Sequence, residues 1–307
     1  MTDVTTSTVP VPPGLAIAPV LPDLLAPVKV RRGFAGFLRN YPTVAIGAAL
    51  LLLLVLMAIL APYLGTVDPT ALAPAKRNRA PSADFWFGTD ALGRDIYSRV
   101  LYGARVSLTV GISVAALATL AGLAIGLVSG VVRWADSILM RFMDGLMSIP
   151  PILLAVALMA LTRGSVGNVI VAITIAEIPR VARLVRSVVL SLREQPYVDA
   201  ATASGTRTPM IILRHILPNT LAPMLVQATY ICASAMIVES ILSFIGAGTP
   251  PTIPSWGNIM AEGRALWQIK PFIVFFPAAF LSATVLAVNL LGDGLRDALD
   301  PRMAKSL

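Results

Sequence analysis

The side chains that could do chemistry in this chain are few, and their types exclude most catalytic and metal sites. The 307 residues contain one histidine, His215, and one cysteine, Cys232. A lone cysteine allows no internal disulfide, and neither residue can form a Cys- or His-cluster metal site. The motifs G-x-x-x-x-G-K-[ST], G-x-G-x-x-G and G-x-S-x-G do not occur, so the sequence indicates no phosphate loop, dinucleotide fold or nucleophile elbow. We therefore predict that the chain is not an enzyme and binds no cofactor or metal.

Acidic side chains in or beside apolar runs are the remaining candidates, because a charge inside a membrane is costly and often functional. Glu177 falls near the end of an apolar run, where a solvated helix end is expected. Glu239 lies deeper, and a cavity-facing role and an interfacial role are equally open for it. Asp293 directly follows an apolar run, and it is expected to mark a solvated boundary.

Residues 196–205 contain the signals of a short helix that could dock on another protein. Pro196 suits the first helical position, where its missing N–H costs nothing, and Asp199 in the first turn complements the helix dipole. Gly205 is expected to end the helix in a left-handed conformation. The helix surface is small, because it carries Ala200, Ala201, Ala203 and Ser204. Such a helix can enter a narrow cleft, so we predict a docking device.

A second short helix is expected directly after Gly205. Thr208 should cap this helix with Pro209 in its first position. Pro218 is then expected to close the segment before the next apolar run begins.

The composition predicts an all-α polytopic membrane protein with about six transmembrane helices. Hydrophobic residues make up 56% of the chain and charged residues 13%, and the mean hydropathy is +0.80. A membrane helix needs about 20 mostly apolar residues. The expected spans are residues 40–67, 106–132, 145–162, 164–185, 216–238 (continuing to about 245) and 271–292. The third is the shortest, and the fourth carries charges at its end.

These spans divide the chain into five parts. The parts are a disordered cytoplasmic tail (1–40), a first transmembrane helix (41–64), an extracytoplasmic loop (65–104), a core with transmembrane helices two to six (105–293) that includes a cytoplasmic loop at 190–218, and a cytoplasmic tail (294–307). Asp3 stands where a cleaved signal peptide has its positive start, so the first span is expected to remain as an anchor.

The distribution of positive charge predicts which side the loops face. The net charge is +8, but the basic residues flank apolar runs, which favours contact with lipid head groups over nucleic acid. Basic residues gather before the first span and between the fourth and fifth, so both termini are expected in the cytoplasm. The five basic residues of the 65–104 loop, three of which are Lys76, Arg77 and Arg79, work against this orientation.

Three glycines in the second span recur every four residues. They are Gly122, Gly126 and Gly130. This spacing lines one helix face with small residues and lets another helix approach closely. We predict that these glycines serve helix packing within the membrane.

The spacing within residues 199–218 is similar to the EAA loop of ABC importer permeases, E-A-A-x3-G-x9-I-x-L-P. The matching residues are Asp199, Ala200, Ala201, Gly205, Leu217 and Pro218. Two positions differ from the pattern. Asp199 stands for the usual Glu and keeps its charge, whereas His215 places a polar residue where the pattern has Ile.

Three further segments resemble the dipeptide/oligopeptide/nickel permease family, and within it the DppC/OppC-type second permease. They are FGTDALGRDIYSR (87–99), PSWGNIMAEGR (254–264) and NLLGDGLRDALDPR (289–302). The likeness extends over about residues 35–303, with four segments in the right order.

The resemblance implies a MetI-like type I importer fold and a set of partners in the bacterial inner membrane. The short helix at 196–204 would insert into a groove on an ATPase subunit, and the chain would work with a second related permease, two ATPase subunits and an extracytoplasmic binding protein. The residues carried over to this coupling role also include Ala203, Ser204 and His215. The 65–104 loop would contact the binding protein or serve as a plain connector.

Alternatives remain at this stage. A secondary transporter or channel driven by an ion gradient would need a functional ionisable residue in the bilayer, and Glu239 is the candidate. A membrane scaffold without transport would have no use for a docking helix. Among importers, peptides are the leading substrate, with nickel or glutathione as the alternatives.

Overall fold

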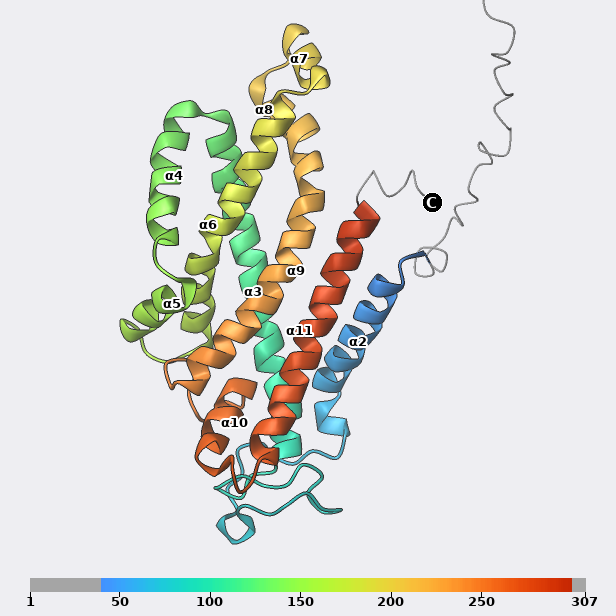
Figure 1. The fold of residues 1–307 in the computed structure, drawn as a ribbon, viewed down its shortest axis with the longest axis vertical. Helices are drawn as coiled ribbons and strands as arrows, with labels where there is room; N and C mark the ends of the chain where they lie inside the picture. Colours follow the sequence, from blue (N-terminus) through green and yellow to red (C-terminus); the bar gives the residue numbers. More distant parts are fainter. Residues whose placement is uncertain (1–39, 300–307) are drawn as a thin grey trace, which may run out of the picture.

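The computed structural model describes residues 40–299, which form a bundle of helices (Figure 1). Within these residues there is no β-strand, only an isolated bridge between Thr89 and Asp95. The predicted all-α class is confirmed. The helices are α2 (Pro42–Ile59), α3 (Ile96–Val131), α4 (Arg133–Met147), α5 (Pro151–Ala160), α6 (Val166–Arg193), α7 (Pro196–Ala203), α8 (Thr208–Ile211), α9 (Leu217–Phe244), α10 (Trp256–Gly263) and α11 (Phe272–Leu299). The expected disorder at the N-terminus lies outside the described residues.

Within residues 40–299, four helical stretches are long and apolar enough to cross a membrane. They are α2, α3, the continuous run from α8 through α9, and α11. The bent pair α4–α5 makes a fifth candidate if it is counted as one span. α6 has 28 residues, but Glu177, Arg180 and Arg183 lower its hydropathy. The described residues thus provide four or five candidate spans where about six were expected, because α6, at the place of the expected fourth span, is too charged to qualify.

The third expected span, residues 145–162, is not one straight helix. α4 and α5 meet at an angle of 87°, and α5 alone has ten residues. Ten residues rise about 15 Å, which is half of the bilayer core. The break falls at Pro150 and Pro151, because a proline disfavours the α conformation in the residue before it. Hydropathy measures the length of an apolar run but does not show whether the run bends.

The second span starts earlier than expected. α3 begins at Ile96, inside the predicted 65–104 loop, and the Asp95 carboxylate accepts the Ser98 N–H at 2.8 Å as its N-cap. Arg99 and Arg105 interrupt the apolar run here, but neither is a loop residue. Arg105 Nε, for example, donates to the Ala58 carbonyl at the end of α2 at 2.6 Å.

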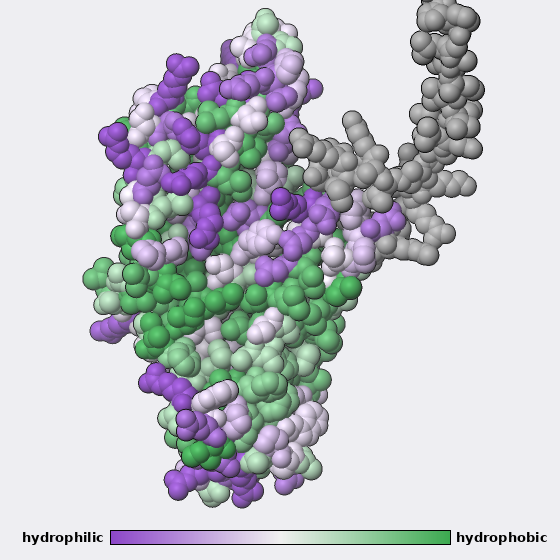
Figure 2. Space-filling model, in the orientation of Figure 1, coloured by the Kyte–Doolittle hydropathy of each residue, from purple (hydrophilic) through white to green (hydrophobic). Residues whose placement is uncertain are grey.

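The bundle has two polar ends separated by an apolar band. α7 projects at one end, while α10 and the connection between α2 and α3 lie at the other (Figure 1). The start of α2 and the end of α11 point toward the α7 end, whereas the end of α2 and the start of α11 lie on the α10 side. Figure 2 shows hydrophobic residues across the middle and hydrophilic residues toward both ends. This distribution suits a protein that crosses a bilayer with α7 on one side and α10 on the other.

Candidate functional site

The segment that forms the predicted docking helix projects from the end of the bundle. α7 begins with Pro196 in its first turn and ends at Ala203, and we call residues 196–205 the α7 knob. Gly205 has φ +77°, its N–H donates to the Thr202 carbonyl, and the Thr206 N–H donates to the Ala201 carbonyl. These two bonds form a Schellman turn. A β-carbon on Gly205 would meet no atom within 4 Å, so the turn needs glycine for its conformation and not for space.

The surface of the α7 knob is open to solvent along nearly its whole length. Val198 is the buried side chain that anchors it, at 5% exposure. Ala201 is half-buried, and the remaining candidate side chains are exposed, namely Asp199, Ala200, Ala203 and Ser204. No ion pair of Asp199 occurs within residues 40–299. The helix therefore presents small side chains and one carboxylate outward, as a docking element must.

The segment that follows the α7 knob differs from its prediction. α8 starts at Thr208 with Arg207 as its N-cap, and Thr208 makes no capping hydrogen bond. Pro218 does not close the segment, because α8, a π turn at Ile212–Ile216 and α9 form one continuous helix. The Leu217 N–H donates to the Ile212 carbonyl, five residues back.

The π turn lies directly before Pro218 for a physical reason. A proline in a helix lacks the N–H for its i−4 carbonyl and clashes with that carbonyl, and a wider turn relieves the clash. The Asn219 side chain donates to the His215 carbonyl at 2.6 Å, next to this turn. Of the predicted coupling residues in this turn, His215 and Leu217 are half-buried and Pro218 is exposed. The His215 ring lies 6.0 Å from the Tyr197 ring of α7.

The three glycines of α3 lie against three valines of α6. A β-carbon on Gly126 would be 2.5 Å from Val185 Cβ, and one on Gly130 would be 2.5 Å from Val189 Cγ1. Gly122 faces Val181 in the same way. Both sets repeat every four residues, so they form one close seam along both helices. Because α6 leads directly into α7, this seam joins the α7 knob to the long helix α3.

Charged groups of α6 tie this helix to α4. Arg186 bonds both oxygens of Asp136, with Nη2 to Oδ2 at 2.7 Å, and Arg183 pairs with Asp144 at 2.5 Å. Arg193 donates to the Gly130 carbonyl at 2.7 Å, at the end of the glycine seam. The sequence indicated these arginines only as a topology signal, but the structure places them in contacts between helices.

The acidic residues near the apolar runs occupy other settings than expected. Glu177 is 1% exposed and accepts from Arg180 at 2.6 Å, so it is not a solvated helix end. Glu239 is fully buried and accepts from Ser243 at 2.8 Å and from Ser107 at 3.4 Å, so within this chain it faces neither a cavity nor the interface. Asp293 is exposed, as expected, but also accepts from the Tyr230 hydroxyl.

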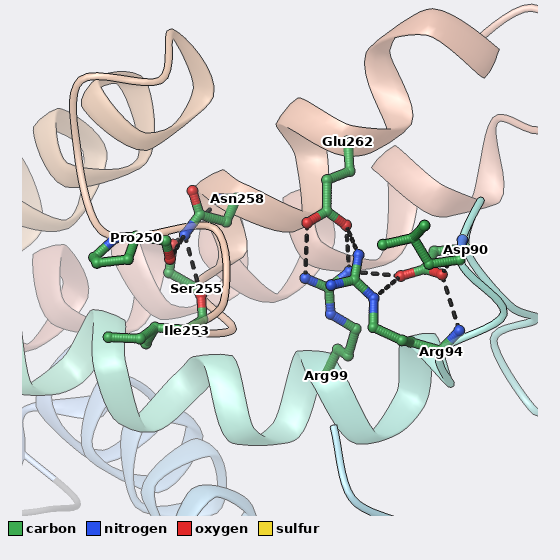
Figure 3. A network of polar contacts seen from close by, with 9 residues as sticks. Asp90, Arg94, Arg99, Pro250, Ile253, Ser255, Asn258 and Glu262 are labelled. Atoms are coloured by element: carbon green, nitrogen blue, oxygen red, sulfur yellow. Dashed lines mark hydrogen bonds and ion pairs between the residues drawn. The ribbon is translucent and has the colours of Figure 1, made fainter. Parts of the chain in front are cut away.

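Two of the recognised segments meet at the other end of the bundle. Residues 87–99 and 254–264 are far apart in sequence, yet Arg99 and Glu262 bond side chain to side chain (Figure 3). No group of three or more His, Cys, Asp or Glu side chains suited to a metal ion occurs in the described part of the chain.

A third recognised segment, 289–302, begins in α11 and contains Gly292 and Gly294. A β-carbon on Gly292 would collide with Thr229 of α9, and one on Gly294 would be 2.5 Å from Val44 Cγ2 of α2. The two glycines therefore let α11 approach a helix on each side. Neither partner helix was predicted from the sequence.

Comparisons with known proteins agree with this arrangement. Residues 118–305 match the family described as binding-protein-dependent transport system inner membrane component. A probable peptide ABC transporter permease protein of Sinorhizobium fredii is 54% identical over 265 residues, covering 86% of this chain and 90% of that protein. The dipeptide transport system permease protein DppC of Alkalihalophilus pseudofirmus is 42% identical, covering 84% and 85%. The glutathione transport system permease protein GsiD of Pectobacterium atrosepticum is 40% identical, covering 94% and 96%.

A solved structure shares the fold. It is titled as an inward-facing conformation of the MetNI methionine ABC transporter, and it aligns with a TM-score of 0.53 at 20% identity, covering 66% of this chain and 96% of that one. The family match, the relatives and the fold confirm the predicted resemblance. The chain belongs to the family of binding-protein-dependent transport system inner membrane components.

Proposed function

We propose that this chain is the membrane-spanning permease subunit of an ATP-driven importer that translocates di- or oligopeptides. The observation that carries the proposal is the exposed α7 knob with its Schellman turn at Gly205, set between two long helices of the bundle. The names of relatives that are 54% and 42% identical, which refer to peptide and dipeptide transport, support the substrate class.

The proposed permease function also implies a set of partners. They are a second related permease subunit, two ATPase subunits, an extracytoplasmic substrate-binding protein and the surrounding lipid. The chain has no phosphate loop of its own, so ATP hydrolysis belongs to the separate subunits. Nucleic acid is not among the expected partners.

The contacts around the α7 knob suggest how movement of an ATPase subunit would reach the membrane. The knob joins α6 on one side and the α8–α9 helix on the other. A displacement of α7 would pull on α6, and the seam of Gly122, Gly126 and Gly130 would pass it to α3. Because packed helices resist compression, such a shift moves them as units.

We propose an orientation with α7 in the cytoplasm and α10 outside. The start of α2 and the end of α11 both point toward the α7 side of the bundle (Figure 1), so the N- and C-termini are proposed to be cytoplasmic in a bacterial inner membrane. Arg180, Arg183, Arg186 and Arg193 of α6 then lie toward the cytoplasmic half, in agreement with the positive-inside rule.

Glutathione is the alternative substrate, because a relative named for glutathione transport is 40% identical over nearly the whole chain. Nickel is a second alternative on the resemblance of the signature segments. Glutathione is itself a small peptide with extra carboxylate and thiol groups, so a substrate panel can separate it from ordinary dipeptides.

The first experiment is native mass spectrometry of the tagged chain, extracted gently from its own membrane. We expect one copy with a second permease and two ATPase subunits. The purified complex, reconstituted with its binding protein, should accumulate a labelled dipeptide only with ATP. Uptake by the chain alone, driven by an ion gradient, would instead support a secondary transporter.

A further inference from the structure

We propose that Arg99 is a positioning residue that locks the outer helix α10 to the start of α3. The lock would present the extracytoplasmic face to the binding protein as one rigid surface. This inference rests on the proposed function, because it presumes that a binding protein docks at this end of the bundle. The residues concerned are Asp90, Arg94, Arg99 and Glu262, which we call the outer clasp.

The outer clasp joins two segments that are remote in sequence (Figure 3). Arg99 Nη1 contacts Asp90 Oδ2 at 2.7 Å and also Glu262 Oε2, while Arg99 Nη2 donates to Glu262 Oε1 at 3.2 Å. Arg94 repeats the arrangement, with Nε on Asp90 at 2.7 Å and Nη2 on Glu262. Each arginine therefore touches both carboxylates, and Glu262 is the member contributed by α10.

Burial makes the outer clasp a fixed unit. The side chains of Arg99 and Asp90 are each 1% exposed, and that of Glu262 is 25% exposed. Two positive and two negative charges balance, so removal of one leaves an uncompensated buried charge. Asp90 is also fixed by the backbone N–H groups of Leu92 and Arg94, at 2.8 and 2.9 Å. The contacts of Asp90 lie within residues 90–99, whereas the contacts of Glu262 connect α10 to Arg94 and Arg99.

The first turn of α10 is attached by another kind of contact. Trp256 is fully buried, and its indole N–H donates to the Val100 carbonyl of α3 at 3.1 Å. Gly257 lets the helix approach α9 so closely that a β-carbon would be 2.5 Å from the Ser240 carbonyl oxygen. The beginning of α10 is thus held by packing and its end by charge. Loss of Arg99 should therefore free the C-terminal end of α10, while its first turn stays packed against α3 and α9.

The outer clasp connects the surfaces that face outward at this end. It joins the α2–α3 connection to the segment between α9 and α11, and both carry exposed large side chains, such as Leu72, Trp86, Trp267 and Ile269. Surfaces that are held in place before association lose less freedom on binding. An arginine suits this role better than a lysine, because its planar fork can reach two carboxylates at once.

The test uses the complete transporter in lipid nanodiscs, with its second permease, its ATPase subunits and its own binding protein. ATP hydrolysis is measured against binding-protein concentration for the wild type, Arg99→Gln and Arg99→Lys. Both variants should raise the half-maximal concentration at least about fivefold, with a saturating rate within about twofold of wild type. Arg163→Gln is the matched control, because Arg163 is exposed, its side chain forms no hydrogen bond or ion pair within residues 40–299, and it lies outside the outer clasp.

Hydrogen exchange on the same complex gives a readout that needs no binding protein. In Arg99→Gln, exchange should accelerate in residues 88–95 and in the last turn of α10, residues 260–263, but not in 217–244. If Arg99→Gln does not assemble, Glu262→Gln replaces it, because Glu262 is partly exposed. Each of the single variants Arg94→Glu and Glu262→Arg should weaken the affinity for the binding protein. The double variant that carries both exchanges should restore part of that affinity.

The outcomes separate this inference from the proposed function. An assembled Arg99→Lys or Glu262→Gln variant with wild-type half-saturation and wild-type exchange would overturn the positioning role. So would a variant that loses its saturating rate at unchanged half-saturation, because that result assigns the outer clasp to a later step. A wild-type complex that no binding protein stimulates would instead contradict the proposed function, while the exchange comparison would still test the outer clasp.

Discussion

Gly126 of α3 lies so close to Val185 of α6 that a β-carbon on the glycine would be 2.5 Å from Val185 Cβ. The same relationship recurs one turn away in each direction. A seam of this kind leaves the two helices no room to separate or slide without repacking. It lies directly behind the α7 knob, because α6 runs into α7 through two residues.

The first prediction concerns this seam. Gly126→Leu should force α3 and α6 apart and lower the free energy of unfolding by about 3 kcal/mol or more, because overpacking a close contact strains both helices. The measurement is the thermal midpoint and the yield of the assembled complex in mild detergent. Gly167→Leu is the control, because a β-carbon on Gly167 of α6 meets no atom within 4 Å. Equal behaviour of the two variants would contradict the packing role.

The second prediction concerns the turn after α7. Gly205 has φ +77° with open space around it, so Gly205→Val should strain the local backbone by about 1–2 kcal/mol without a clash with any other part of the fold. The α7 knob would then be misdirected, and ATP hydrolysis should continue without matching peptide uptake. Gly205→Asn should keep most of the coupling, since asparagine tolerates the left-handed conformation. Normal uptake by Gly205→Val in proteoliposomes would rule out this placement of the coupling helix.

The third prediction separates an ATP-driven importer from an ion-coupled transporter. Glu239 Oε1 accepts from the Ser243 hydroxyl and Oε2 from the Ser107 hydroxyl. A glutamine can accept one of these bonds with its carbonyl oxygen and donate its NH2 to the other hydroxyl, which can also act as an acceptor. Glu239→Gln should therefore keep ATP-dependent uptake within about threefold of wild type, whereas Glu239→Leu should destabilise the fold by leaving the buried Ser107 hydroxyl without its acceptor. Uptake is measured with and without a protonophore. Loss of all uptake in a well-folded Glu239→Gln variant would favour ion coupling.

The fourth prediction concerns the ties between α4 and α6. Arg186 and Asp136 form a two-point pair that is about one-third and one-quarter exposed, whereas Arg183 and Asp144 are both more than half exposed. A double-mutant cycle should give the first pair a coupling of about 1 kcal/mol and the second close to zero, because solvent screens exposed charges. Unfolding in denaturant at low and high salt supplies the values. A larger coupling for the exposed pair would be the contrary result.

Local signals were readable wherever one residue type is needed for one conformation or one distance. Gly205 ends α7 in the left-handed region, and Pro196 begins it. The four-residue spacing of Gly122, Gly126 and Gly130 indicated a packing face before any partner helix was known. In each case the physical requirement acts within a turn or two of the chain, so the sequence carries it directly.

Features that depend on remote contacts were not readable. Hydropathy read Arg99 as part of a loop, although Asp90 and Glu262 neutralise it inside the fold. Glu177 was expected at a solvated helix end, but it is 1% exposed and accepts from Ser234 of α9 at 3.5 Å. Burial that another segment imposes cannot be inferred before that segment is placed. The corner between α4 and α5 is a different case, because its prolines are local and the span count used only the length of the apolar run.

The π turn between α8 and α9 has a consequence for how the α7 knob is aimed. A turn closed by a five-residue hydrogen bond holds one residue more than an α turn, and one residue corresponds to about 100° of rotation around a helix axis. The segment Ile212–Ile216 therefore sets the direction in which α7 points around the axis of α9. The α9 part of this helix can keep its own packing partners while the part next to α7 points in a different direction. A single-residue deletion in Ile212–Ile216 should leave the spans intact and turn the α7 knob away from the surface of the proposed ATPase subunit.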